Sequence, residues 1–171
     1  ATSYIPTDGS TVTRVQETCV GAGNASTFND SEGVLYAEIA ALANDGTKRR
    51  IAISDGTNDN RIVLGYFTDN SIQSFGSVIT SQFNLFDTSS NINLFNKCAI
   101  KYKQNDFALW VNGVEVATDT SGNTPTGLNQ ISIDDGAGAD NFYGNVKAVA
   151  VFKEALTDDE LQQLTGPEYN S

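Results

Sequence analysis

The sequence of 171 residues contains no histidine, and this absence excludes several kinds of chemistry. Without an imidazole there is no Ser-His-Asp triad, no Cys-His dyad and no histidine ligand for a metal. Basic residues are also scarce, with 10 Lys and Arg against 21 Asp and Glu, a net charge of −11 at pH 7. Because such an acidic surface repels phosphate backbones and anionic lipids, we expect no nucleic-acid partner and no binding to a membrane surface.

Methionine and long apolar runs are absent as well. No stretch approaches the ~20 apolar residues that a membrane helix requires, so we expect no membrane insertion. The N-terminus has neither the basic start nor the apolar stretch of a signal peptide. A chain without any Met begins after an initiator or is cut from something longer, and we favour a fragment.

Only two cysteines are present, Cys19 and Cys98. Two are too few for a disulfide scaffold, and their spacing fits no zinc motif. Cys98 falls within an apolar alternation, which favours a small buried hydrophobe. A Cys19–Cys98 bridge stays open, and so does the redox compartment.

What the sequence does contain is a series of short period-2 apolar alternations separated by turn signals, the pattern of an all-β sandwich or barrel. The length of the sequence predicts a single domain. Residues 1–27 are polar apart from an alternation at 10–15, and are expected to be an irregular segment that could end an upstream module. Residues 28–171 are expected to form the domain. Strands are expected near 33–39, 51–53, 62–64, 71–79, 131–133 and 142–152, with a long connection at 80–96 that holds one short strand.

The sharpest local prediction is a meander over residues 97–118. Asn112-Gly113 between two apolar alternations is typical of a type I′ hairpin turn, in which both central residues need positive φ. A four-residue loop at 103–106 precedes it. The expected pairs are Cys98–Val111, Ile100–Leu109, Tyr102–Phe107, Val111–Val114, Trp110–Glu115 and Leu109–Val116. One face of this meander is expected to be core: Cys98, Ile100, Tyr102, Phe107, Leu109, Val111, Val114 and Val116. The other face carries Ala99, Lys101, Ala108, Trp110, Glu115 and Ala117.

One helix is expected, near the C-terminus. Thr157 and Glu160 form a capping box, with Asp158 and Asp159 adding negative charge at the positive end of the helix dipole. Gly166-Pro167 ends the helix.

Two segments carry a family resemblance. Residues 144–152 (GNVKAVAVF) with 154–161 (EALTDDEL) resemble the closing signature of concanavalin A-like lectin/glucanase domains of the laminin-G-like type. Residues 107–114 (FALWVNGV) resemble a hairpin of the same family. The resemblance spans roughly 28–166 and implies a two-sheet antiparallel jelly-roll β-sandwich with one short C-terminal helix, and with it glycan or receptor recognition. Many relatives carry an acidic pair where this chain has Lys147-Ala148, so no role of that pair is carried over.

More narrowly, segments 3–14, 31–38 and 101–103 are similar to lectin-like modules of bacteriophage structural and tail-fibre proteins. This similarity implies a recognition module of a virion or fibre that binds host-surface polysaccharide, located on the virion or outside cells, with other virion subunits as partners and homo-oligomerisation open. The competing hypothesis is a structural or assembly domain that decorates the particle or mediates oligomerisation and binds no sugar.

Catalysis is not expected, although glucanases share this fold. Retaining glycosidases need two carboxyl groups about 5–5.5 Å apart. The glucanase branch supplies them from Glu-x-Asp-x-x-Glu or Glu-x-Asp-x-Glu on one strand, where alternate residues share a face. Neither string occurs in this sequence.

Trp110 is the candidate carbohydrate-binding residue, since an indole stacks on the apolar face of a sugar ring. Lys101 and Glu115 would hydrogen-bond the hydroxyls, and Tyr66 is a second candidate. The alternative is that Trp110 packs beneath a loop, the C-terminal helix or a neighbouring subunit.

Calcium is the one cofactor considered, because the ion takes six to eight oxygen ligands and an acidic loop offers several. The candidate ligands are Asp134, Asp135, Asp140 and Asn141. A weaker alternative is the loop 55–60, and the competing interpretation is a solvated acidic loop without metal.

Overall fold

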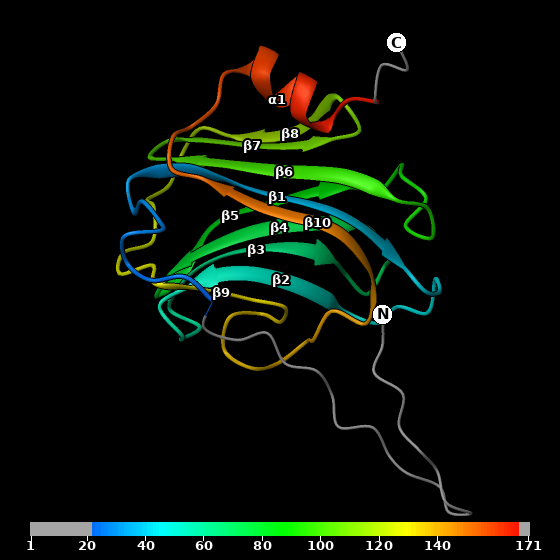
Figure 1. Ribbon diagram of the computed structural model, residues 1–171, viewed down its shortest axis with the longest axis horizontal. Coiled ribbons are helices and arrows are strands. Elements are labelled where there is room, and N and C mark those ends of the chain that lie inside the picture. The colour runs from blue at the N-terminus through cyan, green and yellow to red at the C-terminus, as the bar shows by residue number, and fades with distance from the viewer. Residues whose placement is uncertain (1–21, 168–171) are drawn as a thin grey trace, which may run out of the picture.

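Two antiparallel sheets of five strands pack face to face in the computed structural model, which describes residues 22–167 (Figure 1). Sheet A has the order β5-β4-β3-β2-β9, and sheet B has the order β10-β1-β6-β7-β8. The elements are β1 (Glu32–Ala41), β2 (Arg49–Ser54), β3 (Asn60–Tyr66), β4 (Ile72–Val78), β5 (Thr80–Asp87), β6 (Asn96–Lys103), β7 (Asp106–Val111), β8 (Val114–Asp119), β9 (Gln130–Ser132), β10 (Gly144–Phe152) and α1 (Asp158–Thr165). The expected antiparallel β-sandwich with one short helix is confirmed.

The beginning of the described chain already packs on the sandwich. Ala22 forms an antiparallel bridge with Ile131, and Phe28 is buried in the main core. The alternation at 10–15 and Cys19 lie outside the described residues, and Cys98 is a free, buried cysteine. Within residues 22–167 no helix is long and apolar enough to cross a membrane.

The core lies between the two sheets, and the meander builds one wall of it. Cys98 pairs with Val111, Ile100 with Leu109 and Tyr102 with Phe107, as expected. All six of these side chains belong to the main core. Cys98 is fully buried, and burial raises the pKa of its thiol.

Two details of the β7–β8 hairpin differ from expectation. A β-bulge between Leu109 and Trp110 makes Leu109 pair with Ala117, not with Val116. Val114, expected in the core, is 59% exposed. The reason is that β8 is an edge strand of sheet B, with no neighbour on its far side to cover its first residue.

The segment 80–96 also differs, because it holds the eight-residue strand β5. The many polar side chains of this strand are the reason that the sequence predicts a connection here. They alternate with Phe83 and Leu85, which face the core, so β5 is a half-buried edge strand of sheet A.

Helix α1 begins where the capping box predicts. Glu160 N donates to the Thr157 hydroxyl at 3.4 Å, and Thr157 N donates to the Glu160 carboxylate at 2.8 Å. The helix lies on the outer face of sheet B, on the side away from sheet A (Figure 1).

Candidate functional site

Trp110 is buried on the outer face of sheet B, beneath the helix. Its exposed fraction is 6%, and it packs with Leu161 of α1 in a second apolar cluster. The cluster comprises Val34, Tyr36, Ala99, Ala108, Trp110 and Leu161. Ala99, which pairs with Trp110, and Ala108 are small, which leaves room for the large indole under the helix. The sugar-platform interpretation of Trp110 is therefore wrong in this structure, and the alternative, packing beneath the C-terminal helix, holds.

The two side chains expected to assist Trp110 do not converge into a site. Lys101 is buried and forms an ion pair with Asp106 at 2.9 Å and a longer one with Asp158 at 3.7 Å. The first pair joins β6 to β7, and the second joins β6 to the first turn of α1. Glu115 is exposed on the edge strand β8, opposite Trp110 in the register.

Tyr66 faces the core and offers no surface. It is fully buried, and its hydroxyl donates to the carbonyl oxygen of Ile39 at 3.0 Å. Burial raises the pKa of this phenol. Its neighbour Phe67 is half-buried, with Phe86 edge-on at 5.9 Å and the Lys48 ammonium 5.4 Å from its ring centroid. Tyr66 is therefore a correction: it is a core residue.

The outer face of sheet A carries the most diverse set of polar and aromatic side chains. Alternate residues of each strand face the core, so the intervening ones face outward. The strand register places these outward residues in three rows across the sheet. The rows are Arg50, Gly65, Gln73 and Phe86; then Ala52, Val63, Phe75 and Asn84; then Ser54, Arg61, Ser77 and Ser81.

Phe75 is the centre of this face. The guanidinium carbons of Arg50 and Arg61 lie 4.9 and 5.1 Å from its ring centroid. Beside it, the Gln73 amide donates to the Asn84 amide oxygen at 2.8 Å. Phe75 and Phe86 are both half-buried, while Asn84 is exposed. We call these five residues the Phe75 face: Arg50, Arg61, Gln73, Phe75 and Asn84.

The acidic loop between β9 and β10 borders the Phe75 face. Asp140 pairs with Arg50 at 2.8 Å, and Asp135 pairs with Arg61 at 2.8 Å. At Gly136 a Cβ would come within 3.0 Å of Ser54, so the loop backbone lies directly on β2. The Ser54 hydroxyl donates to the Gly136 carbonyl at 3.0 Å. Thus the loop covers the β9–β2 side of sheet A, while on the far side Gln73 of β4 is buried and Asn84 of β5 is exposed.

These contacts decide the fit of the proposed calcium ligands. Asp134 accepts a hydrogen bond from Gly136 N, and Asp135 accepts from Ala137 N and Ala139 N as well as from Arg61. Calcium needs free oxygen lone pairs directed at one point. Within residues 22–167 no three acidic side chains gather as a metal site would require, a statement that also covers the loop 55–60. In this arrangement Asp134, Asp135, Asp140 and Asn141 do not fit a calcium ion.

The ionisation of the bordering groups reflects their burial and their partners. For Asp135, burial acts to raise the pKa, but the backbone N–H groups of Ala139 and Ala137 and the Arg61 guanidinium outweigh it and hold the pKa below its ordinary value. Burial lowers the pKa of Arg50, and Asp140 opposes this effect. The Nε atoms of Arg50 and Arg61 and the hydroxyl of Ser132 are buried without a hydrogen bond.

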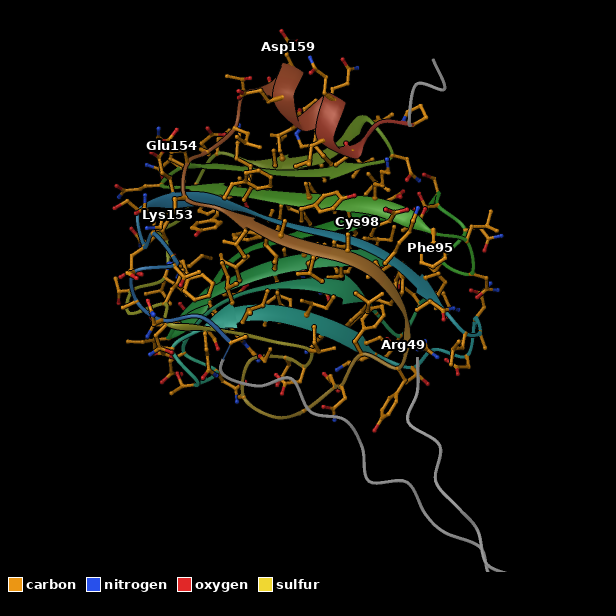
Figure 2. The ribbon with its side chains drawn as sticks, in the orientation of Figure 1. Arg49, Phe95, Cys98, Lys153, Glu154 and Asp159 are labelled. Atoms are coloured by element: carbon orange, nitrogen blue, oxygen red, sulfur yellow. The ribbon has the colours of Figure 1, made fainter. Side chains whose placement is uncertain are left out.

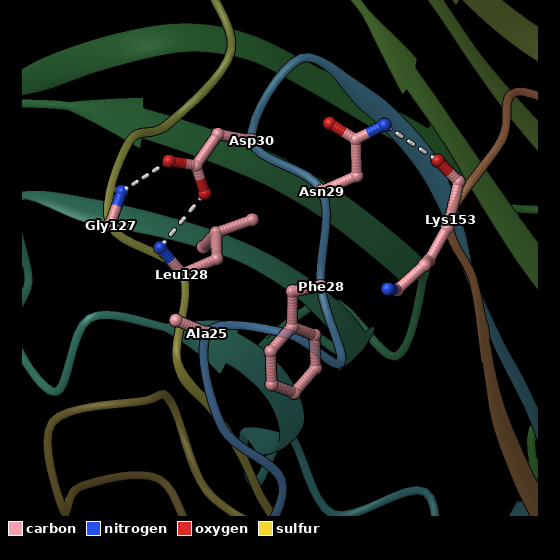
Figure 3. A pocket seen from close by; sticks show the side chains of 7 residues that line it. All are labelled: Ala25, Phe28, Asn29, Asp30, Gly127, Leu128 and Lys153. Carbon is pink, nitrogen blue, oxygen red and sulfur yellow. Dashed lines mark hydrogen bonds between the residues drawn. The ribbon is translucent and has the colours of Figure 1, made fainter.

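A shallow pocket of about 390 Å³ lies elsewhere, between the first described turn and the loop before β9 (Figure 3). Asp30 caps that loop, since its carboxylate accepts from Gly127 N at 2.7 Å and from Leu128 N at 3.0 Å. Asn29 donates to the carbonyl of Lys153 at 2.8 Å. These bonds join the segment 22–31 to the sandwich, so we assign this pocket a structural role.

Comparison with known proteins places the fold. The family model of the concanavalin A-like lectin/glucanases superfamily matches residues 23–162. The comparison with curated proteins finds no match.

Three solved structures illustrate the likeness. The carbohydrate-binding module CBM40 of the Ruminococcus gnavus IT-sialidase, bound to α2,3-sialyllactose, is 18% identical with a TM-score of 0.68, over 88% of this chain and 97% of that one. The intramolecular trans-sialidase of leech is 19% identical with a TM-score of 0.64, over 84% of this chain but 24% of that one. A pentraxin from Limulus polyphemus is 11% identical with a TM-score of 0.67, over 87% and 75%.

At these identities the likeness shows a shared jelly-roll β-sandwich. The family match covers most of the described chain, and it agrees with the closing strand, the helix and the hairpin that the structure contains. The chain belongs to the concanavalin A-like lectin/glucanase superfamily.

Proposed function

We propose that this chain is a non-catalytic carbohydrate-recognition module that binds a glycan on the Phe75 face. The observation that carries the proposal is the Phe75 ring, held against two guanidinium groups and beside the Gln73–Asn84 amide pair. An aromatic ring can contact the apolar face of a sugar, and amide and guanidinium groups can bind its hydroxyls. The solved CBM40 structure with sialyllactose supports carbohydrate as the ligand class for this fold.

The face reaches solvent at its β5 edge. The acidic loop covers the β9–β2 side, whereas Asn84 on the edge strand β5 is exposed. A polysaccharide is a long ligand, and it can approach Phe75 from the exposed β5 edge without displacing the loop. The biological setting that we propose is a bacteriophage virion or fibre outside the cell, where the ligand is a host-surface polysaccharide.

A non-catalytic role fits the acidic residues that border the face. Asp135 and Asp140 are both bound by arginines, and the lowered pKa of Asp135 makes this carboxyl group a poor proton donor. The glucanase acid strings are also absent from the sequence.

The test is a glycan array of bacterial-surface polysaccharides probed with the wild-type chain and with Phe75→Ala, Asn84→Ala and Val114→Ala. We expect reproducible binding to one polysaccharide class, lost in Phe75→Ala and weakened in Asn84→Ala. Asn84 is exposed, so its replacement carries less risk to the fold than that of Phe75, although it removes the acceptor of the Gln73 amide. Val114 is an exposed residue of the other sheet and serves as the matched control. A folded wild-type chain that binds no polysaccharide contradicts the proposal.

The assembly domain is the second candidate, and exposed apolar side chains favour it. Leu42, Ile79 and Leu94 are 67%, 78% and 64% exposed. Trp110 favours neither candidate function, because the helix α1 of the same chain covers it and leaves it accessible to neither a sugar nor a second subunit. Sedimentation analysis separates them: a stable oligomer that dissociates on polar substitution of these residues, in a chain without glycan binding, supports assembly.

A further inference from the structure

A second polar groove lies on sheet B, on the opposite side of the sandwich from the Phe75 face. Its volume is about 530 Å³, within the range of ~300–1,000 Å³ that small-molecule sites occupy. We call it the Phe95 groove, and its lining is Glu38, Phe95, Lys97, Asn112, Lys147, Thr165, Gly166 and Pro167. Phe95 stands at the end of the sandwich where β6 begins (Figure 2).

A buried carboxylate forms part of the groove wall. Glu38 on β1 is 8% exposed, and its Oε1 accepts from the Lys147 ammonium at 2.8 Å. A β-bulge between Glu38 and Ile39 places Lys147 as the extra residue of β10, which brings its side chain to Glu38. Among residues 22–167 no donor is recorded for Oε2 of Glu38, so this oxygen is available as an acceptor in the groove.

An exposed aromatic ring stands next to this carboxylate. Phe95 is 49% exposed, and the Lys147 ammonium lies 5.9 Å from its ring centroid. Its position is fixed by the following residue, because the Asn96 amide donates to the carbonyls of Asn91 and Leu94 at 3.0 and 2.8 Å. A large apolar side chain that is half exposed yet rigidly placed offers a stacking surface.

The opposite wall is equally fixed. Asn112 has φ 50°, and its side chain holds the β7–β8 turn to the start of β6: Oδ1 accepts from Lys97 N at 3.0 Å, and Nδ2 donates to Asn96 Oδ1 at 2.8 Å. The Lys97 ammonium donates to the Gly166 carbonyl just beyond α1 at 3.1 Å. These bonds preorganise the groove, which reduces the entropy lost when a ligand binds.

We infer that the Phe95 groove binds one hexopyranose residue of a neutral glycan. The apolar face of the ring lies on Phe95, and ring hydroxyls donate to the free oxygen of Glu38. A neutral sugar fits better than an acidic one, because the ammonium groups of Lys147 and Lys97 are already bound to Glu38 and to the Gly166 carbonyl, and the Glu38 carboxylate repels an anion. A divalent metal does not fit, because Glu38 is the only carboxylate in the described lining. This site is independent of the Phe75 face and gives the chain two separate glycan contacts.

The test is an amide-correlation NMR titration of the full chain with maltohexaose, cellohexaose, laminarihexaose and mannohexaose. We expect at least one oligosaccharide to move the Asn112 side-chain amide and the Phe95 backbone amide. Phe95→Ala and Glu38→Gln should each weaken that binding roughly tenfold or more, as loss of a central contact does. Leu94→Ala, an exposed neighbour outside the groove, should bind as the wild type does.

The outcomes separate this inference from the proposed function. Loss of the titrated signal in Phe95→Ala but not in Phe75→Ala supports the groove, whatever the glycan array shows. Equal binding by wild type and Phe95→Ala overturns it, as does loss of binding in Phe75→Ala alone. No movement of the Asn112 amide with any of the four probes at millimolar concentration also overturns it. The spectra themselves report whether each variant is folded.

Discussion

The Nη1 atom of Arg61 donates both to the carbonyl oxygen of Asp135, at 2.7 Å, and to its carboxylate, at 2.8 Å, across a sequence separation of 74 residues. This pair anchors the acidic loop to the outer face of sheet A. It also means that Asp135, a candidate calcium ligand in the sequence, binds an arginine. The border of the Phe75 face therefore depends on an ion pair, and its strength should depend on pH.

Acid should weaken this anchor, and Asp135→Asn should reduce the effect. The pKa of Asp135 is lowered on folding, so as pH falls the unfolded chain is protonated first. Its stabilisation is therefore complete above the ordinary value of 3.8 and is lost as pH falls through the lower pKa of the folded state. Urea unfolding of wild type and Asp135→Asn from pH 7 down to about pH 2 measures the difference.

At neutral pH Asp135→Asn should cost about 3 kcal/mol, because Arg61 then lacks its buried partner. Asp59→Asn removes an exposed carboxylate for which no side-chain hydrogen bond is recorded in residues 22–167, and is the matched control. An Asp135→Asn variant with the wild-type stability at pH 7 and the wild-type acid profile would show that the ion pair contributes nothing.

Chelation should leave the fold unchanged. The carboxylates of the acidic loop already accept hydrogen bonds from backbone N–H groups and arginines. Removing divalent ions should therefore break no contact that holds the loop. Thermal unfolding with calcium and with excess EDTA should give the same midpoint. A midpoint that falls on chelation and recovers with calcium would restore the calcium interpretation of Asp134, Asp135, Asp140 and Asn141.

Trp110→Ala should destabilise the chain by about 3–5 kcal/mol, as truncation of a large buried aromatic does. The more conservative Trp110→Phe should fold and bind glycan as the wild type does, since the indole is covered by α1. Tryptophan emission should be that of a buried indole, shielded from iodide and unchanged by saccharide. If saccharide changes the emission and Trp110→Phe loses glycan binding, the glycan site lies at Trp110 on sheet B and not on the Phe75 face.

Loss of the helix cap should loosen the cover over Trp110. Thr157→Ala removes the side-chain acceptor for Glu160 N and should cost about 1 kcal/mol. Hydrogen exchange should become faster in α1 while the strands stay protected. The exposed Thr118→Ala on β8 is a suitable control, and equal exchange in both variants would argue against the cap.

Local signals in the sequence predict much of this fold. The Asn112-Gly113 turn sets the register of the meander because its φ values of 50° and 83° are those that the dipeptide permits. The capping box sets the start of α1 for a similarly local reason. Errors arise where the outcome depends on a neighbour: the bulge at Leu109 and the exposure of Val114 follow from the place of β8 at a sheet edge.

The candidate site was harder to predict, because it depends on contacts between distant segments. Trp110 on an apolar face predicts either a platform or a covered core, and only the position of Leu161 decides. Arg50 and Arg61 do carry a local signal, because each directly precedes a run of three apolar residues in its strand. Their arrangement around Phe75, and their pairing with the acidic loop, follow from strand order and loop path, which no local pattern contains.

The most direct test of the account is to map the glycan on the molecule. Amide-correlation NMR spectra of the chain, with and without fragments of the polysaccharide that it binds on the array, show which side chains the ligand contacts. We predict movement of the Gln73 and Asn84 side-chain amides and of the Phe75 backbone amide. Shifts confined to α1 and the strands beneath it, with the Gln73 and Asn84 amides unmoved, would contradict the assignment of the Phe75 face.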